Sequence, residues 1–216
     1  MQTEYSVELG KDDPALELPW RSDDGVLRYF DLKDQPDLVL QIPEATDHPE
    51  LSGFLTRMNA AGFPLQTAKC DVWFSREISA EEEIFGATAK FCSYVDIVFA
   101  TDEARLTFDK HESLAKALCN LLQQAPEIPA TVEFIVRRCF YHQTNGVVGQ
   151  TAEDSVATCD ASPASGFYVT TYTSGFGENQ DEAHKYWTIA LKLVQHALVQ
   201  VANETANETT PVQDHS

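Results

Sequence analysis

The sequence predicts an α+β fold: a two-layer sandwich in which two long helices cover one face of a mixed or antiparallel sheet of at least four strands. Strand-like alternation of apolar and polar residues occurs four times, over residues 67–76, 90–100, 131–142 and 167–176. Amphipathic helical patterns follow the second and the fourth of these segments, over residues 104–124 and 179–202. The order strand, strand, helix therefore occurs twice, which indicates two ββα units that share one sheet.

The N-terminal part of the chain is predicted to be less regular. Residues 1–14 carry no periodic apolar pattern, so we expect a loose segment ahead of a single domain over residues 15–202. Short strand-like runs at residues 16–21 and 26–32 flank an Asp-Gly pair, which is a strong signal for a hairpin turn. The sequence therefore predicts an N-terminal hairpin.

Capping signals predict where the helices begin. A short helix is expected to start at Asp47, whose side chain can accept a hydrogen bond from the first turn. Asp109 and Glu112 fit a capping box for the first long helix, and an earlier start at Thr101 is the alternative. Asn179 and Glu182 form a capping box for the second. Residues 203–216 are polar and of low complexity, so we expect a disordered tail.

One face of the strands is predicted to form the core together with the apolar stripes of the two long helices. A chain of 216 residues buries enough apolar surface to fold without a disulfide or a metal, so we expect its five cysteines to be free thiols. The residues expected to be buried in this core are Phe74, Val95, Ile97, Phe99, Leu118, Phe134, Val136, Val169, Trp187, Leu191 and Val194.

The charge balance excludes several classes of partner. The chain has 15 Lys and Arg against 34 Asp and Glu, a net charge of −19. Nucleic acids and anionic membrane surfaces are therefore not expected as partners, because both require a basic face. The sequence has neither a long apolar run nor the basic, apolar start of a signal peptide, so we expect a cytoplasmic protein.

The strand face opposite the predicted core combines aromatic side chains with charges. Aromatic residues with polar tips are typical of ligand sites and interface cores. Arg137 can bind a carboxylate or a phosphate, or can be neutralised by Asp71 or Asp96. The residues predicted to bind a ligand or partner are Asp71, Trp73, Tyr94, Asp96, Arg137, Tyr141 and Tyr172.

Two functions and one plain alternative follow from this face. The sequence has no glycine-rich phosphate loop, nucleophile turn or zinc-type histidine pair, so we expect a non-enzymatic binding protein without metal or cofactor. Its partner would be a protein or a second copy of the chain. The alternative is a small-molecule enzyme or sensor, with a pocket between this face and the polar connection over residues 143–165. The plain alternative is an ordinary solvent-facing sheet.

Overall fold

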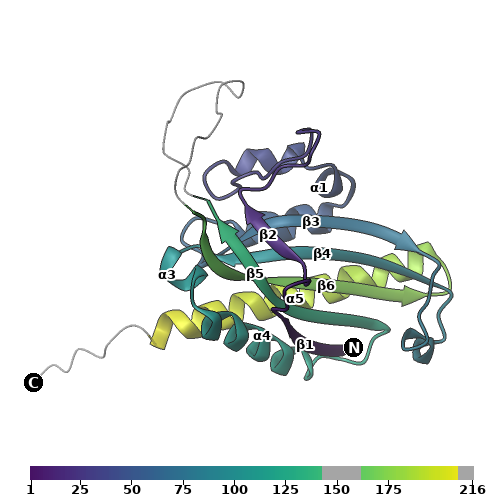
Figure 1. The fold of residues 1–216 in the computed structure, drawn as a ribbon. Coiled ribbons are helices and arrows are strands. Elements are labelled where there is room, and N and C mark those ends of the chain that lie inside the picture. The colour runs from purple at the N-terminus through teal and green to yellow at the C-terminus, as the bar shows by residue number, and fades with distance from the viewer. Residues whose placement is uncertain (143–161, 209–216) are drawn as a thin grey trace, which may run out of the picture.

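The computed structural model describes residues 1–142 and 162–208, with side chains up to Glu204. It is an α+β structure built on a mixed six-stranded sheet (Figure 1). The strands are β1 (Gln2–Glu8), β2 (Ala15–Leu18), β3 (Leu65–Ser75), β4 (Ala89–Phe99), β5 (Ala130–Tyr141) and β6 (Ala164–Gly177). Their order is β1-β5-β6-β4-β3, and β2 also pairs with β5. The strands β5, β6, β4 and β3 are antiparallel neighbours, whereas β1 and β2 run parallel to β5.

The helices follow the strands in the predicted order. Two strands and then a helix occur as β3, β4 and α4, and again as β5, β6 and α5. The α+β class and the mixed sheet are therefore confirmed. The helical elements are η1 (Pro36–Gln41), α1 (Pro43–Asp47), α2 (Pro49–Met58), η2 (Glu82–Phe85), α3 (Asp102–Arg105), α4 (Phe108–Leu122) and α5 (Gln180–Glu208).

The first strand corrects the prediction of a loose segment over residues 1–14. Residues 2–8 form β1, which adds to the edge of β5 in parallel register. The strand buries little apolar surface, because its large apolar side chains, Tyr5 and Val7, remain 38% and 39% exposed. Its sequence therefore shows only a weak apolar periodicity. Pairing with the backbone of β5 supplies the hydrogen bonds that hold this strand, and such tertiary pairing is not visible in local sequence.

The predicted hairpin is present in a reduced form. The Ser22 amide donates to the Leu27 carbonyl at 2.8 Å, and Gly25 occupies the turn with a φ of 72°. Only Arg21 and Arg28 form a bridge between the two arms, so residues 26–32 are not a regular strand. The strand in this region, β2, pairs instead with β5, because the sheet edge offers more backbone partners than the hairpin does.

The helix starts agree with the capping signals only in α5. The Asn179 Oδ1 accepts from the Glu182 amide at 3.1 Å, as expected of a capping box. Asp47 instead ends α1, and α2 begins after His48 without a side-chain cap. Likewise α4 begins after Thr107, so Asp109 lies inside its first turn. Helix α5 continues to residue 208, which moves the start of the expected tail beyond residue 203.

The main core combines helices and strands. Side chains of α2, α4 and α5 form one hydrophobic cluster with alternate residues of β4 and β5. Helix α5 crosses β6 at Gly175, where an added Cβ would lie 2.1 Å from the backbone nitrogen of Trp187. The fully buried Trp187 donates from Nε1 to the Ser93 hydroxyl at 2.8 Å. All predicted core residues are buried except Phe74 and Phe99, which are partly buried.

Two further findings concern membranes and thiols. None of the helices in the described ranges is both long enough and apolar enough to cross a bilayer. The four cysteines in the described ranges, Cys70, Cys92, Cys119 and Cys139, are free. Cys159 and most of the connection predicted to border a pocket (143–161) lie outside the described residues.

Candidate functional site

Four side chains from four neighbouring strands form a continuous row across the sheet. The aromatic row consists of Trp73 of β3, Tyr94 of β4, Tyr172 of β6 and Arg137 of β5. The ring centroids of Trp73 and Tyr94 are 6.4 Å apart, and those of Tyr94 and Tyr172 are 5.9 Å apart. The Arg137 guanidinium lies 5.7 Å from the centroid of the Tyr172 ring. Tilted ring contacts of this kind are favourable for aromatic side chains.

The strand register explains how the row forms. Tyr94 lies opposite Asp71 of β3 on one side and opposite Tyr172 of β6 on the other. Tyr172 in turn lies opposite Glu133 of β5. Because side chains alternate between the two faces of a strand, neighbours such as Val72 point the other way and pack against the main core. The row therefore lies on the face opposite the main core.

Arg137 is fixed in place by polar contacts. Its Nε and Nη2 donate to the same oxygen of Glu8, at 2.8 and 2.7 Å. Its Nη1 donates to the Thr170 hydroxyl at 3.2 Å and to the Tyr172 hydroxyl at 3.5 Å. Burial opposes the charge, but the hydrogen bonds with Tyr172 and Glu8 raise the pKa of Arg137 above its usual value. The row thus ends in a permanently charged, preorganised cation.

Asp96 supports the row from a buried position. The residue is 5% exposed, and its Oδ1 accepts from the Thr170 hydroxyl at 2.7 Å. Burial raises the pKa of this carboxyl to about 6, although the Thr170 hydrogen bond and the charges of Lys69 and Arg137 oppose the shift. Thr170 also accepts from Arg137, so the two charged groups share one hydroxyl. Asp96 therefore helps to position Arg137 through Thr170, and is too deeply buried to contact a partner itself.

Carboxylates flank the row. Asp71 is exposed beside Tyr94, and Glu4 lies directly opposite Glu133 on the neighbouring strand. Burial raises the pKa of Glu133, and the negative charges of Glu4 and Glu8 raise it further. Within the described ranges neither Glu4 nor Glu133 has an ion-pair partner. Like charges directly opposite each other are destabilising, and a cation placed between them would relieve the repulsion.

The N-terminal segment covers one end of this face. Leu16 and Leu18 of β2 pack with Tyr168, Val98 and other residues in a second hydrophobic cluster. The Trp20 indole adjoins this cluster and donates from Nε1 to the Ala68 carbonyl at 2.7 Å. The N-terminal segment therefore covers this part of the face.

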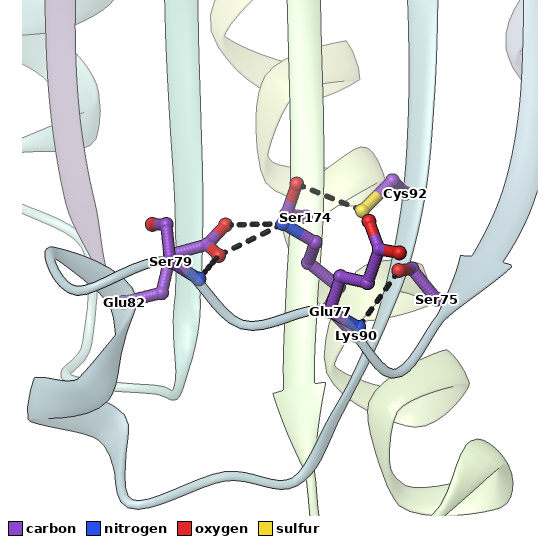
Figure 2. A network of polar contacts seen from close by, with 7 residues as sticks. All are labelled: Ser75, Glu77, Ser79, Glu82, Lys90, Cys92 and Ser174. Carbon is purple, nitrogen blue, oxygen red and sulfur yellow. Dashed lines mark hydrogen bonds and ion pairs between the residues drawn. The ribbon is translucent and has the colours of Figure 1, made fainter.

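The loop that carries η2 covers the other end, and Figure 2 shows the polar contacts that hold it. Lys90 Nζ donates to both carboxylate oxygens of Glu82 at 2.9 and 2.8 Å, and the Ser79 amide donates to the same group at 2.7 Å. Nearby, the Ser174 hydroxyl lies 3.3 Å from the Cys92 sulfur. The row lies between this loop and the N-terminal segment, and Trp73 remains 38% exposed.

The η2 loop also completes the packing beneath it. The ring of Phe85 stacks on that of Phe176, with centroids 4.5 Å apart and planes 12° apart. Phe176 is fully buried as a result of this cover. The loop is thus held by both ion pairing and stacking, which fixes one border of the row.

The structure brings most of the predicted site residues together. Asp71, Trp73, Tyr94, Arg137 and Tyr172 lie in the row or beside it, with Asp96 buried next to Thr170. Tyr141 packs elsewhere. It belongs to the second hydrophobic cluster, its hydroxyl donates to the Phe167 carbonyl at 2.7 Å, and the Arg105 guanidinium lies 5.3 Å from its ring.

The acidic residues of β1 were not predicted to belong to the site. Glu4 and Glu8 contribute charge to the site, but their segment was expected to be loose. The signal that identifies them is the alternation of Glu4, Ser6 and Glu8 with Thr3 and Tyr5, which is compatible with an edge strand. The alternation is weak evidence alone because it contains few apolar residues.

The described residues form neither a cluster of metal ligands nor an activated thiol. The described residues contain no group of three or more His, Cys, Asp or Glu that can hold a metal ion. Burial raises the pKa of the thiols of Cys70 and Cys139 to about 12, and also raises that of Cys92. These thiols are therefore protonated at neutral pH and are poor nucleophiles.

Comparisons of the chain with known protein families, with curated proteins and with solved structures found no match.

Proposed function

We propose that this chain is a non-enzymatic binding protein that uses the aromatic row to hold a basic segment of a protein partner. The observation that carries the proposal is the unbroken series of ring contacts from the exposed Trp73 through Tyr94 and Tyr172 to Arg137. Trp, Tyr and Arg are the residues most enriched among those that dominate binding energy at interfaces. In this proposal α4 and α5 form a second layer on the opposite face of the sheet.

The charges favour a basic partner over a second copy of the chain. The partner's Lys or Arg side chains would lie over the exposed Trp73 ring and the partly buried Tyr rings, near Asp71, Glu4 and Glu133. Burial is the main cause of the raised pKa of Glu133, and such cations would relieve the repulsion from Glu4 and Glu8 that raises it further. Two copies, each with a net charge of −19, would instead bring like charges together. The proposal also places the protein in the cytoplasm. It includes neither a nucleic acid nor a membrane as a partner.

A peptide titration tests the proposal. A short peptide of alternating Lys and Ala, and a matched peptide of alternating Glu and Ala, would be titrated into the protein by isothermal calorimetry. We expect only the Lys peptide to bind, with an affinity that falls as salt is added. Trp73→Ala should weaken this binding about tenfold or more, the effect expected of an interface anchor.

Tyr5 provides a matched control, because it is also 38% exposed but lies outside the row. Tyr5→Ala should leave the affinity for the Lys peptide unchanged. Equal binding of the Glu peptide, or equal losses in the two variants, would contradict the proposal. If the parent self-associates and Trp73→Ala does not, the partner at the row is a second copy of the chain and not a basic segment.

A further inference from the structure

A separate cleft lies between the N-terminal hairpin, the segment from η1 to α1, and the first half of β3. Its volume is about 560 Å³, within the range of small-molecule sites. The cleft touches the aromatic row only at its border, through Asp71 and Tyr94. Tyr172 and Arg137 do not line it. The cleft is therefore a site separate from most of the row.

The walls of this cleft are largely apolar. Leu16, Leu32 and Leu55 line its interior. Val26 and Leu27 line it from the hairpin turn, although they are 75% and 56% exposed. Adjacent aliphatic side chains left open to solvent at the rim of a cleft indicate an apolar ligand that covers them.

Two arginines give the cleft a positive rim. Arg21 and Arg28 line it and lie directly opposite each other across the hairpin. Arg28 lies over the Phe30 ring at 5.6 Å, and neither arginine forms an ion pair with a residue in the described ranges. Like charges placed opposite each other are destabilising. An anion between the two guanidinium groups would turn this repulsion into two charge-assisted hydrogen bonds.

The acids that line the cleft do not neutralise this rim. Glu17 pairs with His142, and the Asp71 carboxylate accepts from the Val72 amide at 2.7 Å. Glu44 lies at the opposite wall, on α1 near Cys70. The turn of the hairpin also carries Asp23 and Asp24, so its formal charge is balanced. Neither aspartate lines the cleft, and the Asp24 carboxylate accepts from the Ser22 hydroxyl and the Val26 amide within the turn.

We propose that this cleft binds an amphipathic carboxylate, with its head group between Arg21 and Arg28 and its aliphatic body along the apolar walls. The carboxylate matches the fork of each guanidinium, and the aliphatic body covers Val26 and Leu27. Binding at this site is independent of the partner proposed for the aromatic row.

Calorimetric titration with decanoate, below its micelle concentration, tests this site. We expect one decanoate per chain. The cation decyltrimethylammonium should not bind because it has the wrong charge, and acetate should not compete because it lacks the apolar body. The double variant Arg21→Gln/Arg28→Gln should weaken decanoate binding about tenfold or more, as expected when charge-assisted hydrogen bonds are lost.

The control variant is Arg76→Gln, because Arg76 also lies over an aromatic ring, that of Phe74, but does not line the cleft. It should bind decanoate as the parent does, and thermal unfolding of each variant checks that the fold is retained. If the double variant does not fold, Leu27→Asp, which places a negative charge at the rim, should give the same loss. Absence of decanoate binding, or equal binding by decyltrimethylammonium, would overturn the proposal.

Discussion

At the scale of single residues, Arg137 links stability to the proposed site. Its guanidinium is mostly buried and donates to Glu8 and Thr170. Arg137→Ala is therefore expected to lower the free energy of unfolding by about 1–3 kcal/mol, the range for hydrogen bonds to charged groups. Urea denaturation measures this change.

Arg76 is the matched control for this stability measurement, because it lies over the Phe74 ring and forms no ion pair with a residue in the described ranges. Arg76→Ala should change the free energy of unfolding by no more than about 0.5 kcal/mol. Equal effects of the two substitutions would show that the contacts of Arg137 add nothing to stability.

Asp96 gives the fold a dependence on pH. Its pKa in the folded protein is about 6, above the ordinary value of 3.8, so the folded state binds this proton more tightly than the unfolded state. The resulting stabilisation is complete below the ordinary value and is lost as the pH rises through 6. The Asn side chain of Asp96→Asn does not titrate. The free energy of unfolding of this variant minus that of the parent should therefore increase by up to about 3 kcal/mol between about pH 4 and pH 7.

Urea denaturation of the parent and of Asp96→Asn at both pH values tests this dependence. The charged groups that oppose the shift, Lys69 and Arg137, are the same in both proteins. A stability difference that does not change with pH would contradict the assigned role of Asp96.

At the scale of elements, the close crossing of α5 over β6 depends on Gly175. A Cβ there would lie 2.1 Å from the Trp187 nitrogen and 2.4 Å from the Ala183 carbonyl, and backbone atoms cannot move aside as a side chain can. Gly175→Ala should therefore lower the free energy of unfolding by about 3 kcal/mol or more.

Gly53 is the control position for this prediction, and thermal or urea denaturation measures the stability of both variants. It lies inside α2 with nothing within 4 Å of an added Cβ. Gly53→Ala should raise the free energy of unfolding by up to about 1 kcal/mol, because Ala is the better helix former. A Gly175→Ala variant as stable as the parent would contradict the close packing of α5 on β6.

The elements that could be predicted from the sequence are those whose pattern is set by burial. The strands β3 to β6 and the helices α4 and α5 each place one side in the main core, so alternation and apolar stripes identify them. β1 could not be predicted in this way, because pairing with β5 holds it at the sheet edge. The strand-like run at residues 16–21 overlaps β2, but its pairing with β5 is not visible in the local sequence. Asp47 could not be recognised as the end of α1, because Pro43 starts a helix that no capping signal marks.

The same reasoning explains which site residues could be predicted. Alternation places Asp71 and Trp73 on one face because the register shift in β3 falls between Thr67 and Lys69, before the row begins. Tyr141 shares that alternation on β5, yet β2 covers this end of the strand. Alternation identifies a face, and the loops and edge strands decide which part of it stays exposed.

At the scale of the whole molecule, the two proposed sites differ in charge. The aromatic row is flanked by carboxylates and is proposed to bind a basic segment, whereas the hairpin cleft has an arginine rim and is proposed to bind an anion. The three tryptophans report on these regions separately. Trp73 belongs to the row, Trp20 lines the cleft, and Trp187 is fully buried in the main core.

Fluorine NMR of protein labelled with 5-fluorotryptophan tests the central claim most directly. Each tryptophan gives one resonance, assigned by single Trp→Phe substitutions. The Lys-Ala peptide should shift the Trp73 resonance and leave those of Trp20 and Trp187 in place, and decanoate should shift only Trp20. A Lys-Ala peptide that binds without shifting the Trp73 resonance would contradict the assignment of the aromatic row as the binding surface.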